Sequence, residues 1–128
     1  MNAEILVVDD EPALADTLAA IFQLADYTAS AVYSGEEALA FIAVHQPSLV
    51  VTDVIMPGLN GIALARTIRT SYPSCRVLLF SGNADTQDLL EAAQQEGHKF
   101  EVLAKPILPP QMLAKVASLL DQRGSSQV

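Results

Sequence analysis

The chain has 128 residues, of which 51% are hydrophobic, and it carries a formal net charge of −8. This size and composition are typical of one folded domain with its own core, and they exclude a disordered chain. Seven Lys and Arg residues stand against fifteen Asp and Glu residues, which argues against direct nucleic-acid binding, because contact with phosphates requires a basic surface.

The first half of the chain predicts two strand–helix pairs. The apolar run EILVV, residues 4–8, favours a strand, and Pro12 suits the first turn of the helix that follows. A second strand is expected over TASAV, residues 28–32. Ser34 can cap the next helix, and Glu37, three residues later, completes a capping box. The first strand is apolar on both faces, which is typical of a strand covered on both sides.

The second half repeats the pattern. SLVVT, residues 48–52, and RVLLF, residues 76–80, are again apolar on both faces and predict buried strands. Asn60 is placed to cap a helix that begins with Gly61 and Ile62. Asp85 is placed to cap a further helix that ends at Gly97, where glycine can adopt the backbone conformation of a helix end.

The end of the chain predicts a fifth strand and a fifth helix. FEVLA, residues 100–104, is the strand, and residues 109–123 place Leu113, Val116 and Leu120 on one stripe. We expect one domain over residues 1–122 and a frayed tail at 123–128. Five alternating strands and helices, joined by right-handed crossovers, predict a doubly wound α/β sandwich of three layers around a parallel sheet.

Polar residues follow four of the five strands at the points where the strands end. They are Asp9, Asp10, Asp53, Ser81 and Lys105. Open α/β sheets bind ligands beyond the carboxyl ends of their strands, so these side chains are expected to meet. Three neighbouring carboxylates repel one another, and a hard cation such as Mg²⁺, which prefers oxygen ligands, offsets that repulsion.

This set of groups suits phosphoryl transfer, which depends on positioning and on stabilising charge. Asp53 stands alone after the central strand and is the better candidate for the nucleophile. Asp9 and Asp10 are better placed to hold a metal ion. Each residue also has a structural interpretation: Asp10 as a helix cap, Asp53 and Ser81 as turn residues, and Lys105 as a surface lysine.

The remaining reactive side chains predict no second site. Cys75 precedes an apolar run and is expected to be a reduced, structural thiol. His45 and His98 lack a plausible ligand partner and are expected to be solvated. The apolar runs are too short to cross a membrane, and the N-terminus is acidic where a signal peptide would be basic, so a cytoplasmic location is expected.

Four motifs resemble the receiver domain of two-component response regulators: LVVDDEP, VVTDVIMPGLNG, LLFSG and LAKP. The resemblance implies a flavodoxin-like fold with strand order 2-1-3-4-5. It also implies that Asp53 accepts a phosphoryl group from a sensor histidine kinase or a phosphotransfer protein. The chain would then be a phospho-acceptor that assists its own phosphorylation and dephosphorylation, not an enzyme.

The resemblance also assigns roles around Asp53. Asp10 would bind Mg²⁺ directly, Asp9 partly through water, and the backbone carbonyl of Ile55 would be a further ligand. Lys105 would pair with the phosphoryl oxygens, across a peptide bond to Pro106 that is often cis in the family. Ser81 would move to bond the phosphoryl group and so change the surface of the fourth helix, fifth strand and fifth helix, where a homodimer is also possible.

The sequence departs from the family pattern near the expected switch. The aromatic residue usual three positions before the lysine is replaced by Val102, and Phe100 is the nearest aromatic, on the same strand face by alternation. Gly82 stands where alanine is usual in the family. The stretch from Gly97 to Lys105 is one residue longer than the commonest spacing in the family. By the resemblance, Ile55 and Asn83 would flank the phosphorylated aspartate and tune its hydrolysis. The apolar Ile55, which cannot position an attacking water, predicts a phosphoryl group of moderate to long lifetime.

Three other classes of protein are alternatives to a phosphorylated switch. A phosphohydrolase of the haloacid dehalogenase type would resemble D-x-D, with an acid two residues after the nucleophile. Asp53 is followed at that distance by the apolar Ile55, and Asp9 by Glu11, which is a poor substitute. A flavodoxin would need a phosphate loop after the first strand, where acidic residues would repel phosphate. A degenerate receiver that only binds partners is a further alternative. A downstream partner or fused output domain is not specified by these residues.

Overall fold

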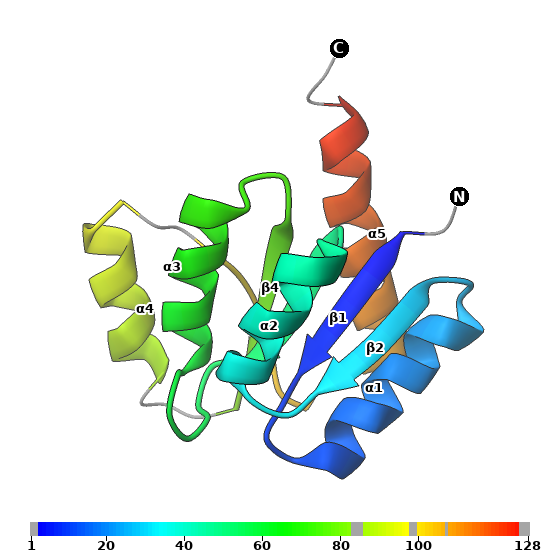
Figure 1. The fold of residues 1–128 in the computed structure, drawn as a ribbon, viewed down its shortest axis with the longest axis horizontal. Coiled ribbons are helices and arrows are strands. Elements are labelled where there is room, and N and C mark those ends of the chain that lie inside the picture. Colours follow the sequence, from blue (N-terminus) through cyan, green and yellow to red (C-terminus); the bar gives the residue numbers. More distant parts are fainter. Residues whose placement is uncertain (1–2, 83–85, 98–99, 107, 126–128) are drawn as a thin grey trace.

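A parallel sheet of five strands forms the centre of the molecule, and helices cover both of its faces (Figure 1). This computed structural model describes residues 3–82, 86–97, 100–106 and 108–125. The strand order is β2-β1-β3-β4-β5, which confirms the predicted doubly wound, flavodoxin-like fold. The strands are β1 (Glu4–Val8), β2 (Thr28–Val32), β3 (Leu49–Asp53), β4 (Arg76–Ser81) and β5 (Glu101–Ala104).

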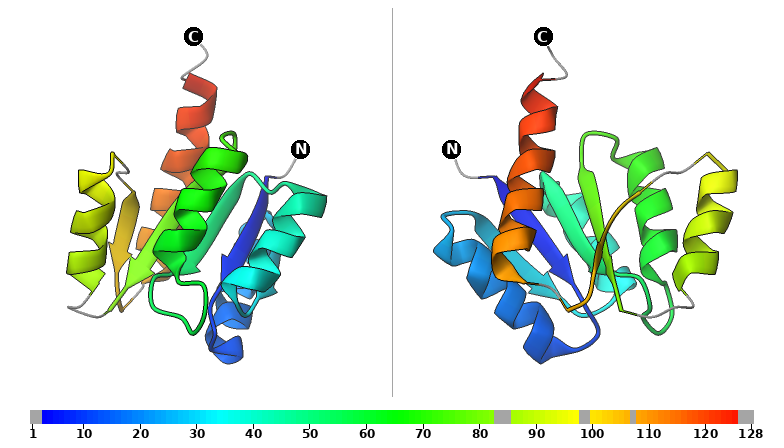
Figure 2. Two further views of the ribbon diagram at one scale, coloured as in Figure 1. Left: turned by 60° about the vertical axis from the view of Figure 1, so that its left-hand side comes forward. Right: turned by 180° about the vertical axis from the view of Figure 1, so that it is seen from behind.

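The five helices divide between the two faces of the sheet (Figure 2). One face packs against α1 and α5, and the other packs against α2, α3 and α4. Strands β1 and β3 are buried along nearly their whole length, as their continuous apolar sequences predict. The helices are α1 (Pro12–Leu24), α2 (Gly35–His45), α3 (Gly61–Ser71), α4 (Thr86–Gln95) and α5 (Pro109–Ser125).

The predicted helix caps are confirmed at two of the positions that the structure describes. Ser34 Oγ accepts a hydrogen bond from the Glu37 backbone N–H at 3.0 Å, and Asn60 Oδ1 accepts from Ala63 N–H at 2.9 Å. The reciprocal half of the capping box is displaced by one residue, because Glu37 Oε1 accepts from Tyr33 N–H. Asp85 lies outside the described residues.

Helix α5 departs from its predicted stripe and length. Met112, Val116 and Leu119 are its buried apolar residues, whereas Leu113 and Leu120 pack at the margin of the same core. The helix continues to Ser125, so it includes the first three residues of the expected tail. Within the described residues, none of the helices combines the length and apolar character that a membrane span requires.

Cys75 and His45 lie in structural surroundings. The Cys75 side chain is buried in the core between the sheet and helices α2 and α3, and its thiol donates to the Arg76 carbonyl oxygen at 3.5 Å. His45 is exposed and stacks on Phe41, with ring centroids 4.2 Å apart. Both observations agree with the sequence-based expectation, while His98 is not among the described residues.

Candidate functional site

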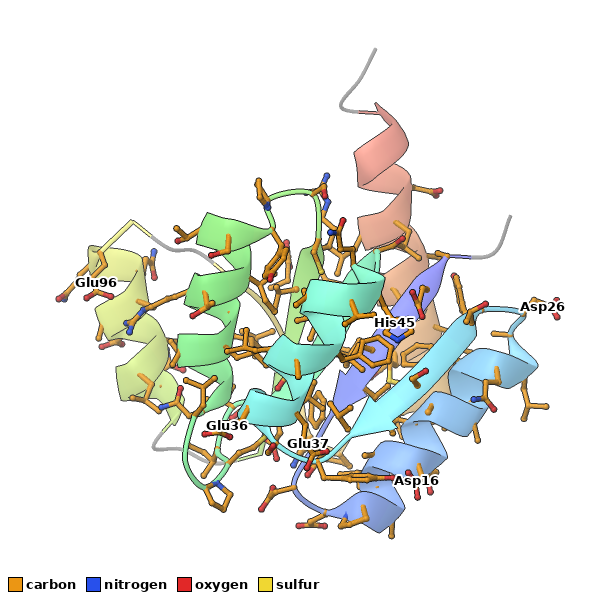
Figure 3. All side chains as sticks on the ribbon, in the orientation of Figure 1. Asp16, Asp26, Glu36, Glu37, His45 and Glu96 are labelled. Carbon is orange, nitrogen blue, oxygen red and sulfur yellow. The ribbon has the colours of Figure 1, made fainter. Side chains whose placement is uncertain are left out.

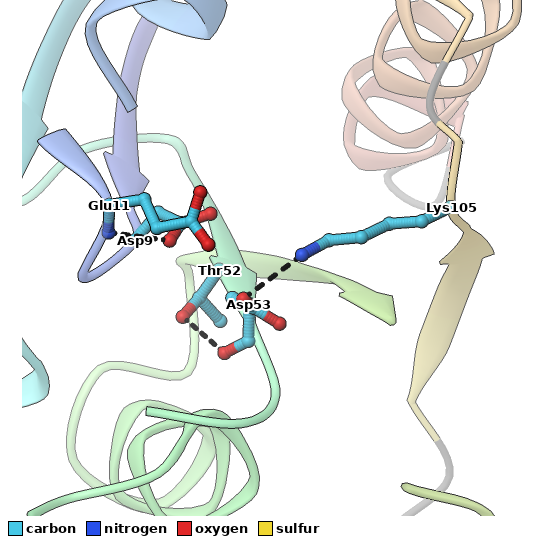
Figure 4. A network of polar contacts seen from close by, with 5 residues as sticks. All are labelled: Asp9, Glu11, Thr52, Asp53 and Lys105. Carbon is cyan, nitrogen blue, oxygen red and sulfur yellow. Dashed lines mark hydrogen bonds and ion pairs between the residues drawn. The ribbon is translucent and has the colours of Figure 1, made fainter. Parts of the chain in front are cut away.

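Three carboxylates meet at the carboxyl edge of the sheet, as the topology predicts. Asp9 and Asp10 follow β1, and Asp53 is the last residue of the adjacent strand β3. One oxygen from each of the three lies within 4.8 Å of the others. Lys105, which follows β5, reaches across this edge toward Asp53 (Figure 4). Residues far apart in the sequence therefore form one acidic cluster, with the positively charged Lys105 side chain beside it.

Asp53 is held by contacts to both its side chain and its backbone. Its Oδ2 atom accepts a hydrogen bond from Lys105 Nζ at 3.1 Å, and the residue is 8% exposed. The Thr52 hydroxyl donates to the Asp53 carbonyl oxygen at 3.0 Å. Asp53 thus lies on a fixed strand end, with the positive charge of Lys105 against one carboxylate oxygen.

Asp9 is the most deeply buried carboxylate of the cluster. Its Oδ1 atom accepts a hydrogen bond from the Glu11 backbone N–H at 2.9 Å. Its Oδ2 atom is buried and has no hydrogen-bond partner among the described residues. Burial, and then the nearby charges of Asp53 and Asp10, raise the pKa of Asp9 to about 6, although the Glu11 N–H and Lys105 oppose this rise.

Asp10 does not cap helix α1. The capping position is Glu11, and no side chain bonds to the first amides of the helix. Asp10 is exposed, and one of its oxygens belongs to the carboxylate cluster. The alternative interpretation of Asp10 as a helix cap is therefore wrong.

The residues expected to act as the switch lie on β4, on β5 and directly before β5. Ser81 is the last residue of β4, and its carbonyl oxygen accepts a hydrogen bond from Lys105 N–H at 2.8 Å. Phe100 and Val102 pack on the same small core, as strand alternation predicts. The Arg69 guanidinium lies 4.4 Å from the Phe100 ring centroid. Asn83 is outside the described residues.

Two glycines pack closely against residues of the site, and their contacts are only partly predictable from sequence. Gly82 packs against Lys105: a Cβ added at Gly82 would lie 3.0 Å from Lys105 Cβ. Gly61 packs against the Asp53 backbone so closely that an added Cβ would overlap the Asp53 carbonyl oxygen. Gly61 belongs to the motif VVTDVIMPGLNG, but the contact that requires glycine there depends on the folded chain. The Lys105–Pro106 peptide bond is cis, in agreement with the resemblance.

The acidic cluster fits a hard divalent cation. Carboxylate oxygens are the ligands that Mg²⁺ prefers, and the unpartnered Asp9 Oδ2 is a buried acceptor that a cation or its bound water would satisfy. Ile55 lies two residues beyond Asp53 in the loop before α3, and 43% of it is exposed. The residues present therefore suit the metal that the sequence predicts.

The sequence matches the response regulator receiver domain family over residues 5–117. It is 28% identical over 120 residues to the DNA-binding response regulator MtrA of Mycolicibacterium smegmatis, a match that covers 94% of this chain and 51% of MtrA. It is 37% identical over 117 residues to the response regulator protein FleR of Pseudomonas aeruginosa, covering 91% of this chain and 24% of FleR. The chain thus spans about half or less of the length of these relatives.

Solved structures show the same likeness. The crystal structure of a response regulator receiver domain protein from Clostridium thermocellum superposes with a TM-score of 0.86 at 26% identity, covering 95% of this chain and 97% of that one. The family match spans most of the chain and includes Asp9, Asp10, Asp53, Ser81 and Lys105. This protein belongs to the receiver domain family of two-component response regulators.

Proposed function

We propose that Asp53 accepts a phosphoryl group from a phosphohistidine on a sensor histidine kinase or a phosphotransfer protein. The observation that carries this proposal is the setting of the Asp53 carboxylate, which is paired with Lys105 and lies beside Asp9 and Asp10. Asp53 lies at the sheet edge where ligands of open α/β sheets bind, and 8% of the residue is exposed. Receiver domains of this family take part in phosphorylation signalling.

In the proposed transfer, an Asp53 carboxylate oxygen attacks the phosphorus atom of the donor. The phosphorus–nitrogen bond breaks, its electron pair stays with the leaving imidazole, and Asp53 becomes an acyl phosphate. Lys105 stabilises the negative charge that is shared between the carboxylate and the phosphoryl oxygens. The Ser81 hydroxyl, at the neighbouring strand end, donates a hydrogen bond to the same oxygens.

Mg²⁺ would be held by the carboxylates of Asp9, Asp10 and Asp53 and by the Ile55 backbone carbonyl. When bound, it supplies positive charge that lowers the repulsion between the carboxylates and an incoming phosphoryl group. The Asp9 carboxylate is oriented toward this role by the Glu11 N–H, which leaves its second oxygen available.

The phosphoryl donor requires a docking surface near the phosphorylation site, and an apolar groove of about 360 Å³ lies beside Lys105. Helix α1 contributes Leu14 and Ile21, and Pro106 and Pro109 form the other side. Lys105 lines both the groove and the phosphorylation site. A donor that covers these apolar side chains would bring its phosphohistidine toward Asp53, so we assign the groove to the donor.

The output would be a change at the surface formed by α4, β5 and α5. Ser81 moves toward the phosphoryl group in this proposal. Val102 lies on the adjacent strand β5 and Phe100 directly precedes that strand, and both pack against the core below α3 and α4. Such a change would alter binding of a downstream partner, a fused output domain or a second copy of the chain.

Labelling with acetyl phosphate tests the proposal directly. The intact mass is expected to rise by one phosphoryl group in Mg²⁺, with no rise in a chelator and none in Asp53→Asn. Asp26→Asn is the matched control, because Asp26 follows α1 at the opposite edge of the sheet and asparagine tolerates its positive φ of 72° (Figure 3). Labelling that ignores the metal or survives in Asp53→Asn would refute the assignment and favour a phosphorylation-independent interaction module.

The phosphoryl group is expected to persist for minutes rather than seconds at neutral pH. Ile55 is half-exposed next to Asp53, and its apolar side chain offers no acceptor to orient an attacking water. Loss of the added mass from purified phosphorylated protein, followed over time in Mg²⁺, measures this lifetime. Ile55→Asn, which introduces a hydrogen-bonding group, is expected to shorten it. A wild-type label that disappears within seconds would contradict the expectation.

A further inference from the structure

The first turn of α2 lies directly against residues 54–60, the loop that joins β3 to α3, called the β3–α3 loop here. Glu36 Oε2 accepts a hydrogen bond from the Leu59 backbone N–H at 3.1 Å. The two residues are 23 positions apart, so this contact joins separate elements of the fold. It holds one side of the loop that includes Ile55, two residues after Asp53.

Two glycines make this close approach possible. A Cβ added at Gly35 would lie 2.7 Å from the Leu59 carbonyl oxygen, which is a backbone atom and cannot move aside alone. A Cβ added at Gly58 would lie 2.9 Å from Glu36 Oε2, and Gly58 also has a φ of 72°. The start of α2 and the loop are therefore in van der Waals contact on both sides of the hydrogen bond.

The two glutamates at the start of α2 have different partners. Glu37 Oε1 accepts from Tyr33 N–H, in the turn that leads into the helix. Glu36 instead reaches out of its helix to the β3–α3 loop, and Figure 3 shows the two side chains extending from the same end of α2 in different directions. The helix is already capped by Ser34, so the Glu36 carboxylate is not required for capping.

The β3–α3 loop is anchored at its ends and exposed between them. Met56 is buried in the core below α2 and α3, and Gly61 N–H donates to the Val54 carbonyl oxygen at 2.9 Å. Ile55, Pro57 and Gly58 are exposed. The Glu36 contact adds a charge-assisted hydrogen bond to this exposed part, where neither strand nor helix restrains the backbone.

We propose that Glu36 is a positioning residue for the cation site: it holds the β3–α3 loop so that the Ile55 carbonyl stays next to Asp53. This inference rests on the proposed function, because the Ile55 carbonyl is assigned there as a cation ligand. Loss of the acceptor leaves Leu59 N–H to solvent and frees the loop, so a bound cation must then order the loop. Cation affinity falls accordingly.

Glu36→Ala tests the role through metal binding alone. Mn²⁺, which accepts the same oxygen ligands as Mg²⁺, is titrated against the unphosphorylated protein and detected by electron paramagnetic resonance. We expect affinity to fall about five-fold, as loss of one exposed charge-assisted hydrogen bond suggests. Glu36→Gln, which keeps an oxygen acceptor, is expected to retain most of the affinity. Glu91→Ala, an exposed glutamate change on α4, is the control and should leave it unchanged.

A second variant and a second measurement separate positioning from stability. Gly35→Ala keeps the carboxylate but pushes the loop away, so it is expected to weaken Mn²⁺ binding as well. Amide hydrogen exchange at Leu59 should be faster in Glu36→Ala than in the wild type without added metal. Unchanged Mn²⁺ affinity in Glu36→Ala overturns the inference, even if its melting temperature falls. If the wild type binds Mn²⁺ but is never labelled at Asp53, the proposed function is wrong. The positioning role of Glu36 is then still decided by the Mn²⁺ titration.

Discussion

Asp9→Asn is expected to raise the free energy of unfolding of the metal-free protein by about 2 kcal/mol, or roughly 8 °C in melting temperature. The wild-type protein buries the Asp9 carboxylate completely and leaves its Oδ2 atom without a partner among the described residues. Asparagine removes the buried charge and keeps the oxygen that accepts from Glu11 N–H. Thermal unfolding in a chelator at neutral pH measures the effect.

The pH dependence of the stability difference between the wild type and Asp9→Asn shows whether the buried Asp9 charge causes that difference. Folding raises the pKa of Asp9 from 3.8 to about 6, mainly through burial. The folded protein then binds this proton more tightly than the unfolded chain, so the contribution of Asp9 to stability is fully present below pH 3.8 and is lost as the pH rises through about 6. The advantage of Asp9→Asn should therefore grow across this interval and level off above it.

Divalent metal should make the wild type more stable than Asp9→Asn, which is the reverse of their order in chelator. A cation that binds only the folded state stabilises it by mass action, and the wild type offers that cation one more carboxylate than Asp9→Asn does. Saturating Mg²⁺ should raise the melting temperature of the wild type and have little effect on the variant. A variant that is less stable than the wild type in chelator would show that burial of the Asp9 charge is not costly.

The fold could be predicted because the central strands carry an unusual sequence signal. Strands β1 and β3 are apolar at consecutive positions, and only strands covered on both faces need that pattern. The sequence determines less well which side of a terminal helix faces the core. In α5 the predicted stripe of Leu113, Val116 and Leu120 is rotated toward the buried Met112 and Leu119, since several apolar residues allow more than one face to pack.

The members of the site could be predicted from topology, but their environments could not. Parallel strands place their carboxyl ends at one edge, and that is sufficient to bring Asp53 near Lys105. Asp9 and Asp10 are adjacent in sequence, yet the first is fully buried and the second is exposed. Their difference depends on how the chain turns from β1 into α1.

Contacts between a side chain and a distant backbone were also beyond sequence reasoning. The hydrogen bond from Leu59 N–H to Glu36 joins the β3–α3 loop to the start of α2. No repeating sequence pattern links these two segments. Sequence patterns report the faces of helices and strands, so they contain the signal for a capping pair such as Ser34 and Glu37 but none for this contact.

Gly61→Ala is expected to lower the free energy of unfolding by about 3 kcal/mol. An added Cβ would overlap the Asp53 carbonyl oxygen and lie 2.9 Å from the Asp53 carbonyl carbon and from Val54 Cα. These are backbone atoms of a buried strand end, so no side-chain rotation relieves the clash. Urea denaturation followed by circular dichroism measures the loss.

Gly97→Ala is the control for this change. Gly97 has a φ of 94°, and nothing lies within 4 Å of an added Cβ, so its cost is conformational and about 1 kcal/mol. The folded fraction of Gly61→Ala should also be labelled more slowly by acetyl phosphate, because relief of the clash displaces Asp53 from Lys105. Equal costs for the two variants, with unchanged labelling, would mean that α3 and the end of β3 can separate without displacing Asp53 from Lys105.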